Sequence, residues 1–215
     1  MSKSCPSCGG PSLDGHVCAR CARKAYGGAR QHRFGQGQSA SAGPDLHYLD
    51  GVVHPRIVRA MHAADAALRR AGVPHALVGG LAVGVHGAPR ATRDVDFLVG
   101  EEAFEHHGGG LVTVRAGVPV AFEGVAVDPL SIGAGEKFLR RTMEKAPVVG
   151  GVPVLPIAAL VYLKLKSPRG KDRGDIEEMI KAGAVDAAAT RAYLKRAPVA
   201  LRRKFDAILA SVERE

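Results

Sequence analysis

Two aspartates near the middle of the chain have the types and spacing for metal chemistry. Asp94 and Asp96 lie two positions apart in RDVDFLV, so a strand there projects both carboxylates from one face, roughly 6 to 7 Å apart along the chain. One divalent cation can bridge such a pair, and Mg²⁺ combines few carboxylates with phosphate oxygens and water. An Asp-x-Asp is also common on a solvated strand edge, so the residues around it decide between the two interpretations.

A pair of glycines precedes the two acids by about fifteen positions. Gly79-Gly80 follows a short apolar strand and precedes a short helix. Glycine lets backbone come close to a phosphate, and the first N–H groups of a helix are free to donate to it. Alone, the pair is a turn; ahead of two acids it predicts a phosphate-binding loop beside a metal site.

A third carboxylate, Asp128, lies in the predicted strand Val125–Leu130, on the face opposite Val125 and Val127. A neighbouring strand can therefore bring it beside Asp94 and Asp96. The competing interpretation is an isolated acid at a strand end.

The elements that must hold these residues follow from hydrophobic periodicity and from glycine and proline breaks. Together they predict an α+β fold, with a mixed β-sheet core and C-terminal helices from about residue 156. The predicted strands are His75–Val78, Arg93–Val99, Leu111–Val114, Val118–Phe122 and Val125–Leu130, the last two joined as a hairpin; the predicted helices are Pro55–Ala71, Leu81–His86, Glu136–Lys145, Pro156–Lys166, Asp172–Lys181, Asp186–Arg196 and Val199–Val212.

One lysine continues an apolar helical stripe. Lys164 follows Ile157, Leu160 and Val161 at helical spacing, so its ammonium either points inward toward a phosphate or carboxylate, or reaches past the core to water. Asp172 and Asp175, at the start of the next predicted helix, have the spacing of an N-cap and N3 pair, which favours capping.

The segment LVGGLAVGVHGAPRATRDVDFLV resembles the GG and R-x-T-x-D-x-D signature of polymerase-beta-like nucleotidyltransferases, of the minimal and AbiEii-toxin type. A looser resemblance extends through Asp128 and KLKSPRGKDRGDIEEM to about residue 182. Many members of the superfamily have serine where this chain has Gly80.

The resemblance implies transfer of a nucleoside monophosphate from an NTP to a hydroxyl of RNA, such as a tRNA end, or of a protein, with release of pyrophosphate. It implies two Mg²⁺ ions and, as a possible partner, a cognate antitoxin in a toxin or phage-defence role. By the same resemblance, Asp94, Asp96 and Asp128 are catalytic and hold Mg²⁺, and the nucleotide-binding residues are Gly79, Gly80, Arg90, Thr92, Lys164, Lys171 and Asp172.

All four cysteines lie near the start of the chain, as Cys5-x-x-Cys8 and Cys18-x-x-Cys21. Two such pairs complete a tetrahedral Cys₄ set with no open position, which predicts a structural Zn²⁺ in a zinc ribbon over residues 1–26. Two disulfides are the alternative for a secreted protein. Residues 27–51 have linker composition, which leaves residues 52–215 for the nucleotidyltransferase domain.

The 215 residues carry a formal net charge of +9, which favours anionic partners. No secretory signal is evident and the most apolar window is too short to cross a bilayer, so we expect a cytoplasmic protein with no membrane partner. The alternative function is a catalytically inactive zinc-ribbon adaptor that binds nucleic acid. A glycosyltransferase that uses an Asp-x-Asp would need several βα units ahead of the acids, for which the chain has no room.

Overall fold

The computed structural model describes residues 3–4, 11–12 and 43–215, and the chain divides into two units, Met1–Ser39 and Ala40–Glu215. In the first unit, β1 (Lys3–Ser4) pairs antiparallel with β2 (Pro11–Ser12). The predicted zinc ribbon with its four cysteines, and the predicted linker as far as residue 42, otherwise lie outside the described residues.

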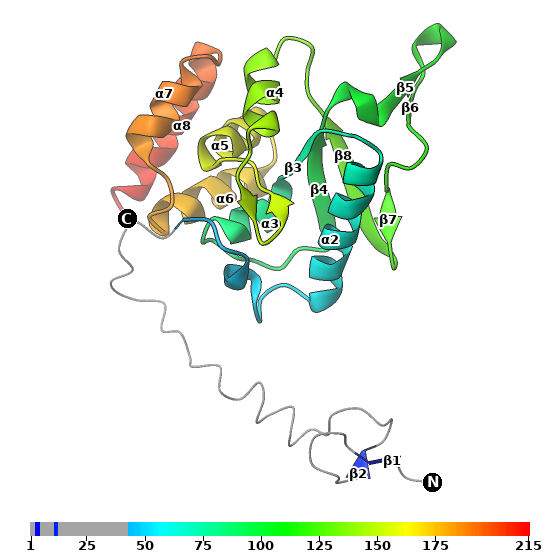
Figure 1. Ribbon diagram of the computed structural model, residues 1–215. Helices are drawn as coiled ribbons and strands as arrows, with labels where there is room; N and C mark the ends of the chain where they lie inside the picture. Colours follow the sequence, from blue (N-terminus) through cyan, green and yellow to red (C-terminus); the bar gives the residue numbers. More distant parts are fainter. Residues whose placement is uncertain (1–2, 5–10, 13–42) are drawn as a thin grey trace. The chain divides into compact units, whose positions relative to one another are not determined.

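A four-stranded mixed sheet lies at the centre of the second unit (Figure 1). Its order is β3 (His75–Leu77), β4 (Asp94–Val99), β8 (Val125–Ser131) and β7 (Ala121–Phe122). The central β4–β8 pair is parallel, and the two outer pairs are antiparallel. This sheet, followed by C-terminal helices, confirms the predicted α+β class.

The predicted hairpin between β7 and β8 is present. Phe122 and Val125 are partners across a two-residue turn, Glu123 and Gly124, whose φ angles are 47° and 73°. Positive φ at both central positions matches the right-handed twist of the flanking strands.

A second hairpin lies outside the central sheet. The predicted strand at 111–114 forms as β6 (Val112–Val114) but pairs with β5 (Phe104–His106), which periodicity did not predict. No residue of either strand is buried, and β5, with the sequence Phe-Glu-His, has no apolar alternation to mark it as a strand. The short hairpin of β9 (Val148–Val149) and β10 (Val152–Pro153) was also missed.

Helices cover the sheet and continue to the C-terminus (Figure 1). Each begins and ends within two residues of its predicted bounds. In the described residues they are α2 (Pro55–Arg70), α3 (Gly79–Val85), α4 (Lys137–Glu144), α5 (Ile157–Lys166), α6 (Gly170–Lys181), α7 (Ala187–Leu194) and α8 (Val199–Val212), with 3₁₀ turns at Leu46–Leu49 (η1), Glu101–Ala103 (η2) and Gly108–Gly110 (η3).

The predicted linker extends too far toward the C-terminus. Leu49 in η1 is 2% exposed and belongs to the hydrophobic core, and the Asp45 N–H donates to the Val85 carbonyl at the end of α3 (2.9 Å). Residues 45–49 are therefore part of the folded second unit. Two leucines three residues apart were enough to anchor a segment whose average composition is that of a linker.

Across residues 3–4, 11–12 and 43–215, none of the helices combines the length and apolar character needed to cross a bilayer.

Candidate active site

Three carboxylates converge on one face of the central sheet. The parallel register of β4 and β8 places Asp96 directly opposite Asp128, and Asp94 lies two residues before Asp96 on the same face. One carboxylate oxygen from each of the three lies within 4.8 Å of the other two. Asp94 and Asp96 are half-buried, whereas Asp128 is exposed. The structure therefore brings together the three acids that the sequence singled out.

The cluster is electrostatically unfavourable without a cation. Burial, followed by the charges of Asp94 and Asp128, raises the pKa of Asp96 to about 6, although Lys164 and Lys171 act in the opposite direction. Like charges at this separation resist ionising together. Carboxylate oxygens are the donors that Mg²⁺ prefers, and one open side leaves room for water or phosphate oxygens. The donor set fits this ion.

Gly79 makes room for the cluster. Its φ is +64°, and a Cβ at this position would overlap the Asp96 carboxylate. A Cβ on Gly80 would lie 3.0 Å from Thr92 Oγ1 and 3.2 Å from an Arg90 guanidinium nitrogen. Both glycines therefore allow close packing of α3 against site residues, a contact role in addition to the phosphate role that the sequence predicted.

Thr92 and Arg90 fix the segment that leads into β4. Thr92 Oγ1 donates to Asp94 Oδ1 at 2.8 Å, which holds one acid of the cluster. Arg90 donates through Nε and Nη2 to both oxygens of Asp175 on α6, at 2.6 and 3.0 Å. This bidentate pair connects the loop before β4 to α6.

Lys164 is buried, at 5% exposure, and faces carboxylates. Its Nζ donates to Asp172 Oδ1 at 3.0 Å and to Asp175 Oδ2 at 2.5 Å. The interpretation in which the ammonium reaches water is therefore wrong. Because an unpaired ammonium in this position would be costly, the two acids are its obligatory partners.

The capping interpretation of the two α6 acids is also wrong. The helix begins at Gly170 with Arg169 as its N-cap residue, so Asp172 and Asp175 lie inside it, both buried. Burial acts to raise the pKa of Asp172, but hydrogen bonds from Ser167 and Lys164 outweigh it and lower the value to about 2.

Asp175 shows the same balance. Burial acts to raise its pKa, and the hydrogen bonds from Arg90 and Lys164 lower it. We call these four residues, Arg90, Lys164, Asp172 and Asp175, the ion network. Asp175 was predicted only as a helix cap. The sequence signal for this network was a lysine, Lys164, on the apolar side of one predicted helix, together with a pair of acids at the start of the next.

Lys171 differs from Lys164 in its exposure. Its side chain is exposed, and its positive charge acts to lower the pKa of Asp96 against the larger effect of burial. Of the predicted site residues of the second unit, three acids form the acid cluster, Gly79 packs against Asp96, Gly80 packs against Thr92 and Arg90, and Thr92 holds Asp94. Arg90, Lys164 and Asp172 belong to the ion network, and Lys171 is exposed.

No known family model matches the chain, and no curated protein is similar to it. Among solved structures, the chain is similar to an antigenic nucleotidyltransferase-like protein from Paracoccidioides brasiliensis, with 14% sequence identity and a TM-score of 0.40 over 74% of this chain and 94% of that one.

Proposed function

We propose that the protein is a Mg²⁺-dependent nucleotidyltransferase that moves a nucleoside monophosphate from an NTP to a hydroxyl acceptor. The observation that carries the proposal is the convergence of Asp94, Asp96 and Asp128 from two parallel strands. The Gly-Gly and R-x-T-x-D-x-D resemblance of the sequence supports the same reaction.

The three acids of the cluster would hold Mg²⁺. When bound, the metal would neutralise charge on the phosphate oxygens of the NTP and of the transition state. Thr92 holds Asp94 by its hydrogen bond, and Gly79 leaves the space that Asp96 needs. The exposed ammonium of Lys171 is available to the triphosphate.

The reaction balances without any oxidant or reductant. The acceptor oxygen forms a bond to the α-phosphorus, the bond from that phosphorus to the α,β-bridging oxygen breaks, and pyrophosphate leaves. Asp128, the exposed member of the cluster, accepts the hydroxyl proton and passes it to water. Its exposure makes it the acid that an incoming acceptor can reach.

Incubation of the full chain with each α-labelled NTP, Mg²⁺ and a cell extract tests the proposal. We expect the parent protein to transfer the label to a macromolecule, and loss of that label on treatment with ribonuclease or with protease identifies the acceptor as RNA or as protein. Asp94→Asn/Asp96→Asn should transfer no label. Asp50→Asn, an exposed acid in the segment before α2, is the control and should label normally. Equal labelling by the double variant would refute the assignment.

A toxin or phage-defence role with a cognate antitoxin rests on the sequence resemblance. If it holds, expression of the parent chain should arrest growth of a bacterial host, and expression of Asp94→Asn/Asp96→Asn should not. Equal growth arrest by both chains would separate toxicity from nucleotide transfer.

A further inference from the structure

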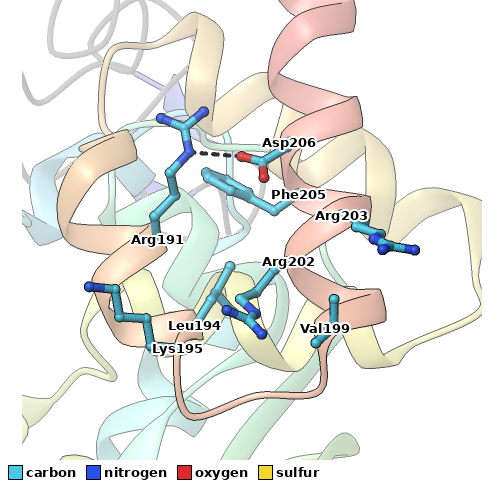
Figure 2. A pocket seen from close by; sticks show the side chains of 8 residues that line it. All are labelled: Arg191, Leu194, Lys195, Val199, Arg202, Arg203, Phe205 and Asp206. Atoms are coloured by element: carbon cyan, nitrogen blue, oxygen red, sulfur yellow. Dashed lines mark hydrogen bonds and ion pairs between the residues drawn. The ribbon is translucent and has the colours of Figure 1, made fainter.

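The two C-terminal helices line an open pocket that shares no residue with the acid cluster. α7 and α8 are joined by a short connection, and between them lies a space of about 340 Å³ (Figure 2). We call it the basic pocket. Its lining residues are Arg191, Leu194, Lys195, Val199, Arg202, Arg203, Phe205 and Asp206.

Positive charge dominates this pocket. Four of the eight lining residues are cationic and one is acidic, and the acid, Asp206, is already paired with Arg191 at 2.8 Å (Figure 2). Over residues 191–206 the chain has six lysines and arginines and one acid, a local charge of +5 against +9 for the whole chain. The pocket therefore attracts anions.

Most of that charge is not neutralised within the fold. Within residues 43–215, Lys195, Arg202 and Arg203 form no salt bridge. Arg202 Nε is buried and has no hydrogen-bond partner in that part of the chain. A buried donor without an acceptor is unfavourable.

The chemistry of the lining favours phosphate. Arginine guanidinium groups present forked donors that match phosphate geometry, and Leu194, Val199 and Phe205 form an apolar wall. Of these three, Leu194 and Phe205 are buried, and Val199, at 51% exposure, offers an apolar surface on which a sugar or base can pack. A phosphate within a polynucleotide satisfies both halves of the pocket.

Hydrogen bonds connect α8, which lines the basic pocket, to elements of the candidate active site. Lys204 of α8 donates to the carbonyls of Leu165 (2.9 Å) and Ser167 (3.3 Å) at the C-terminal end of α5. α5 carries Lys164, and α6, which packs against α8, carries Asp172 and Asp175. A nucleic acid bound at α7 and α8 is thus attached to the same unit of the protein that carries the ion network and the acid cluster.

We propose that the basic pocket binds the phosphate backbone of a nucleic acid, and that this nucleic acid is the acceptor of the transferred nucleotide. The second part rests on the proposed function; the first does not. The pocket thereby favours a nucleic acid over protein as the acceptor.

The test measures binding to a short fluorescein-labelled single-stranded RNA by fluorescence anisotropy. All proteins compared are full-length chains that also carry Asp94→Asn/Asp96→Asn, so that no transfer occurs during the measurement. Arg202→Glu/Arg203→Glu should bind about tenfold more weakly. The slope of log affinity against log salt should fall in magnitude by about 1.4, for two lost phosphate contacts at about 0.7 each.

Arg56→Glu/Arg59→Glu is the matched control. Both arginines are exposed on α2, at the other end of the second unit in Figure 1, and the change in net charge is the same. Should Arg202→Glu/Arg203→Glu fail to fold by circular dichroism, Lys195→Ala/Arg203→Ala replaces it, since both side chains are exposed, and should show the same loss of salt dependence.

Two results would overturn the pocket assignment. The first is that Arg202→Glu/Arg203→Glu binds RNA with the same affinity and the same salt slope as the control variant. The second is that polyglutamate displaces the labelled RNA as effectively as unlabelled RNA does at equal total charge. RNA binding that needs the pocket, without nucleotide transfer to any acceptor, would keep the pocket and refute the proposed function. Transfer to protein alone would keep the function and refute the acceptor.

Discussion

Asp96 of the acid cluster carries an electrostatic cost in the folded protein. Its raised pKa means that the folded protein holds a proton that the unfolded chain releases. As pH rises from about 4 to about 6, this acid therefore removes stability, and above pH 6 the full cost is present. The arrangement is typical of a site in which burial prepares side chains for a ligand.

Asp96→Asn should therefore stabilise the metal-free protein while abolishing transfer. In EDTA at pH 7.5 we expect a gain of roughly 1–3 kcal/mol in the free energy of unfolding, shrinking toward zero near pH 4. Urea denaturation at both pH values measures it. Mg²⁺ should stabilise the parent more than the variant, and equal stability of the two proteins in EDTA at pH 7.5 would contradict the prediction.

Gly79→Ala should disable the site by displacing Asp96. The new Cβ would overlap the Asp96 carboxylate, and the positive φ adds strain. We expect at least a hundredfold loss of transfer rate, because a misplaced metal ligand affects the reacting centre directly.

Gly72→Ala separates the two effects of that substitution. Gly72 also has a φ of +64°, but a Cβ there meets nothing within 4 Å. It should lose about 1 kcal/mol of stability through strain and keep its transfer rate. Similar rates for the two alanine variants would show that Gly79 does not position Asp96.

At the scale of elements, α5, α6 and the loop before β4 are held together by the ion network. Lys164 comes from α5, Asp172 and Asp175 from α6, and Arg90 from the loop. Removing one partner of a buried ion pair leaves an uncompensated charge, which is more destabilising than loss of a surface pair. The network supports the acid cluster by fixing the elements around it.

Lys164→Met should lower the free energy of unfolding by about 3 kcal/mol or more at pH 7, because it removes one partner from each of two buried carboxylates. The lowered pKa values of Asp172 and Asp175 imply stability that is present above about pH 4 and lost as pH falls toward 2. Stability measured by thermal unfolding between pH 4 and pH 2 should therefore fall more steeply in the parent than in Lys164→Met.

Lys166→Met on the same helix is the control for that experiment. Lys166 is 43% exposed on its side chain and pairs with Glu136, so its loss should cost less than about 1 kcal/mol. If both methionine variants lose the same stability at pH 7, the ion network does not contribute as a buried unit.

At the scale of the whole molecule, the acid cluster, the ion network and the hydrophobic core all lie in the second unit, Ala40–Glu215. Deletion of residues 1–39 should therefore leave the melting temperature of this unit and its stabilisation by Mg²⁺ unchanged. Differential scanning fluorimetry with and without Mg²⁺ measures both. A truncated chain that no longer melts cooperatively would refute this independence.

The cysteines of the first unit lead to a separate expectation. The full chain should contain one Zn²⁺ per molecule by elemental analysis, and Cys5→Ser/Cys8→Ser should contain none, because two ligands cannot hold a structural site. With a labelled acceptor in excess, the transfer rate should remain within a factor of about two. Zinc that survives the double substitution would rule out the Cys₄ site.

The sequence by itself predicted most helices and strands of the second unit, because each is encoded by a local period of apolar residues. The Gly79-Gly80 turn and the spacing of Asp94 and Asp96 are local in the same sense. β6 was predicted, but β5 and its pairing with β6 were not, because no residue of β5 is buried and its sequence has no apolar period.

Tertiary structure alone decided how distant segments meet. Only the parallel register of β4 and β8 places Asp128 opposite Asp96, only the packing of α5 on α6 gives Lys164 its two acids, and only the closure of α7 on α8 forms the basic pocket. These contacts join residues of different strands and helices, from 8 positions apart for Lys164 and Asp172 to 32 for Asp96 and Asp128. They depend on strand register and helix packing, which the local period of a sequence does not specify.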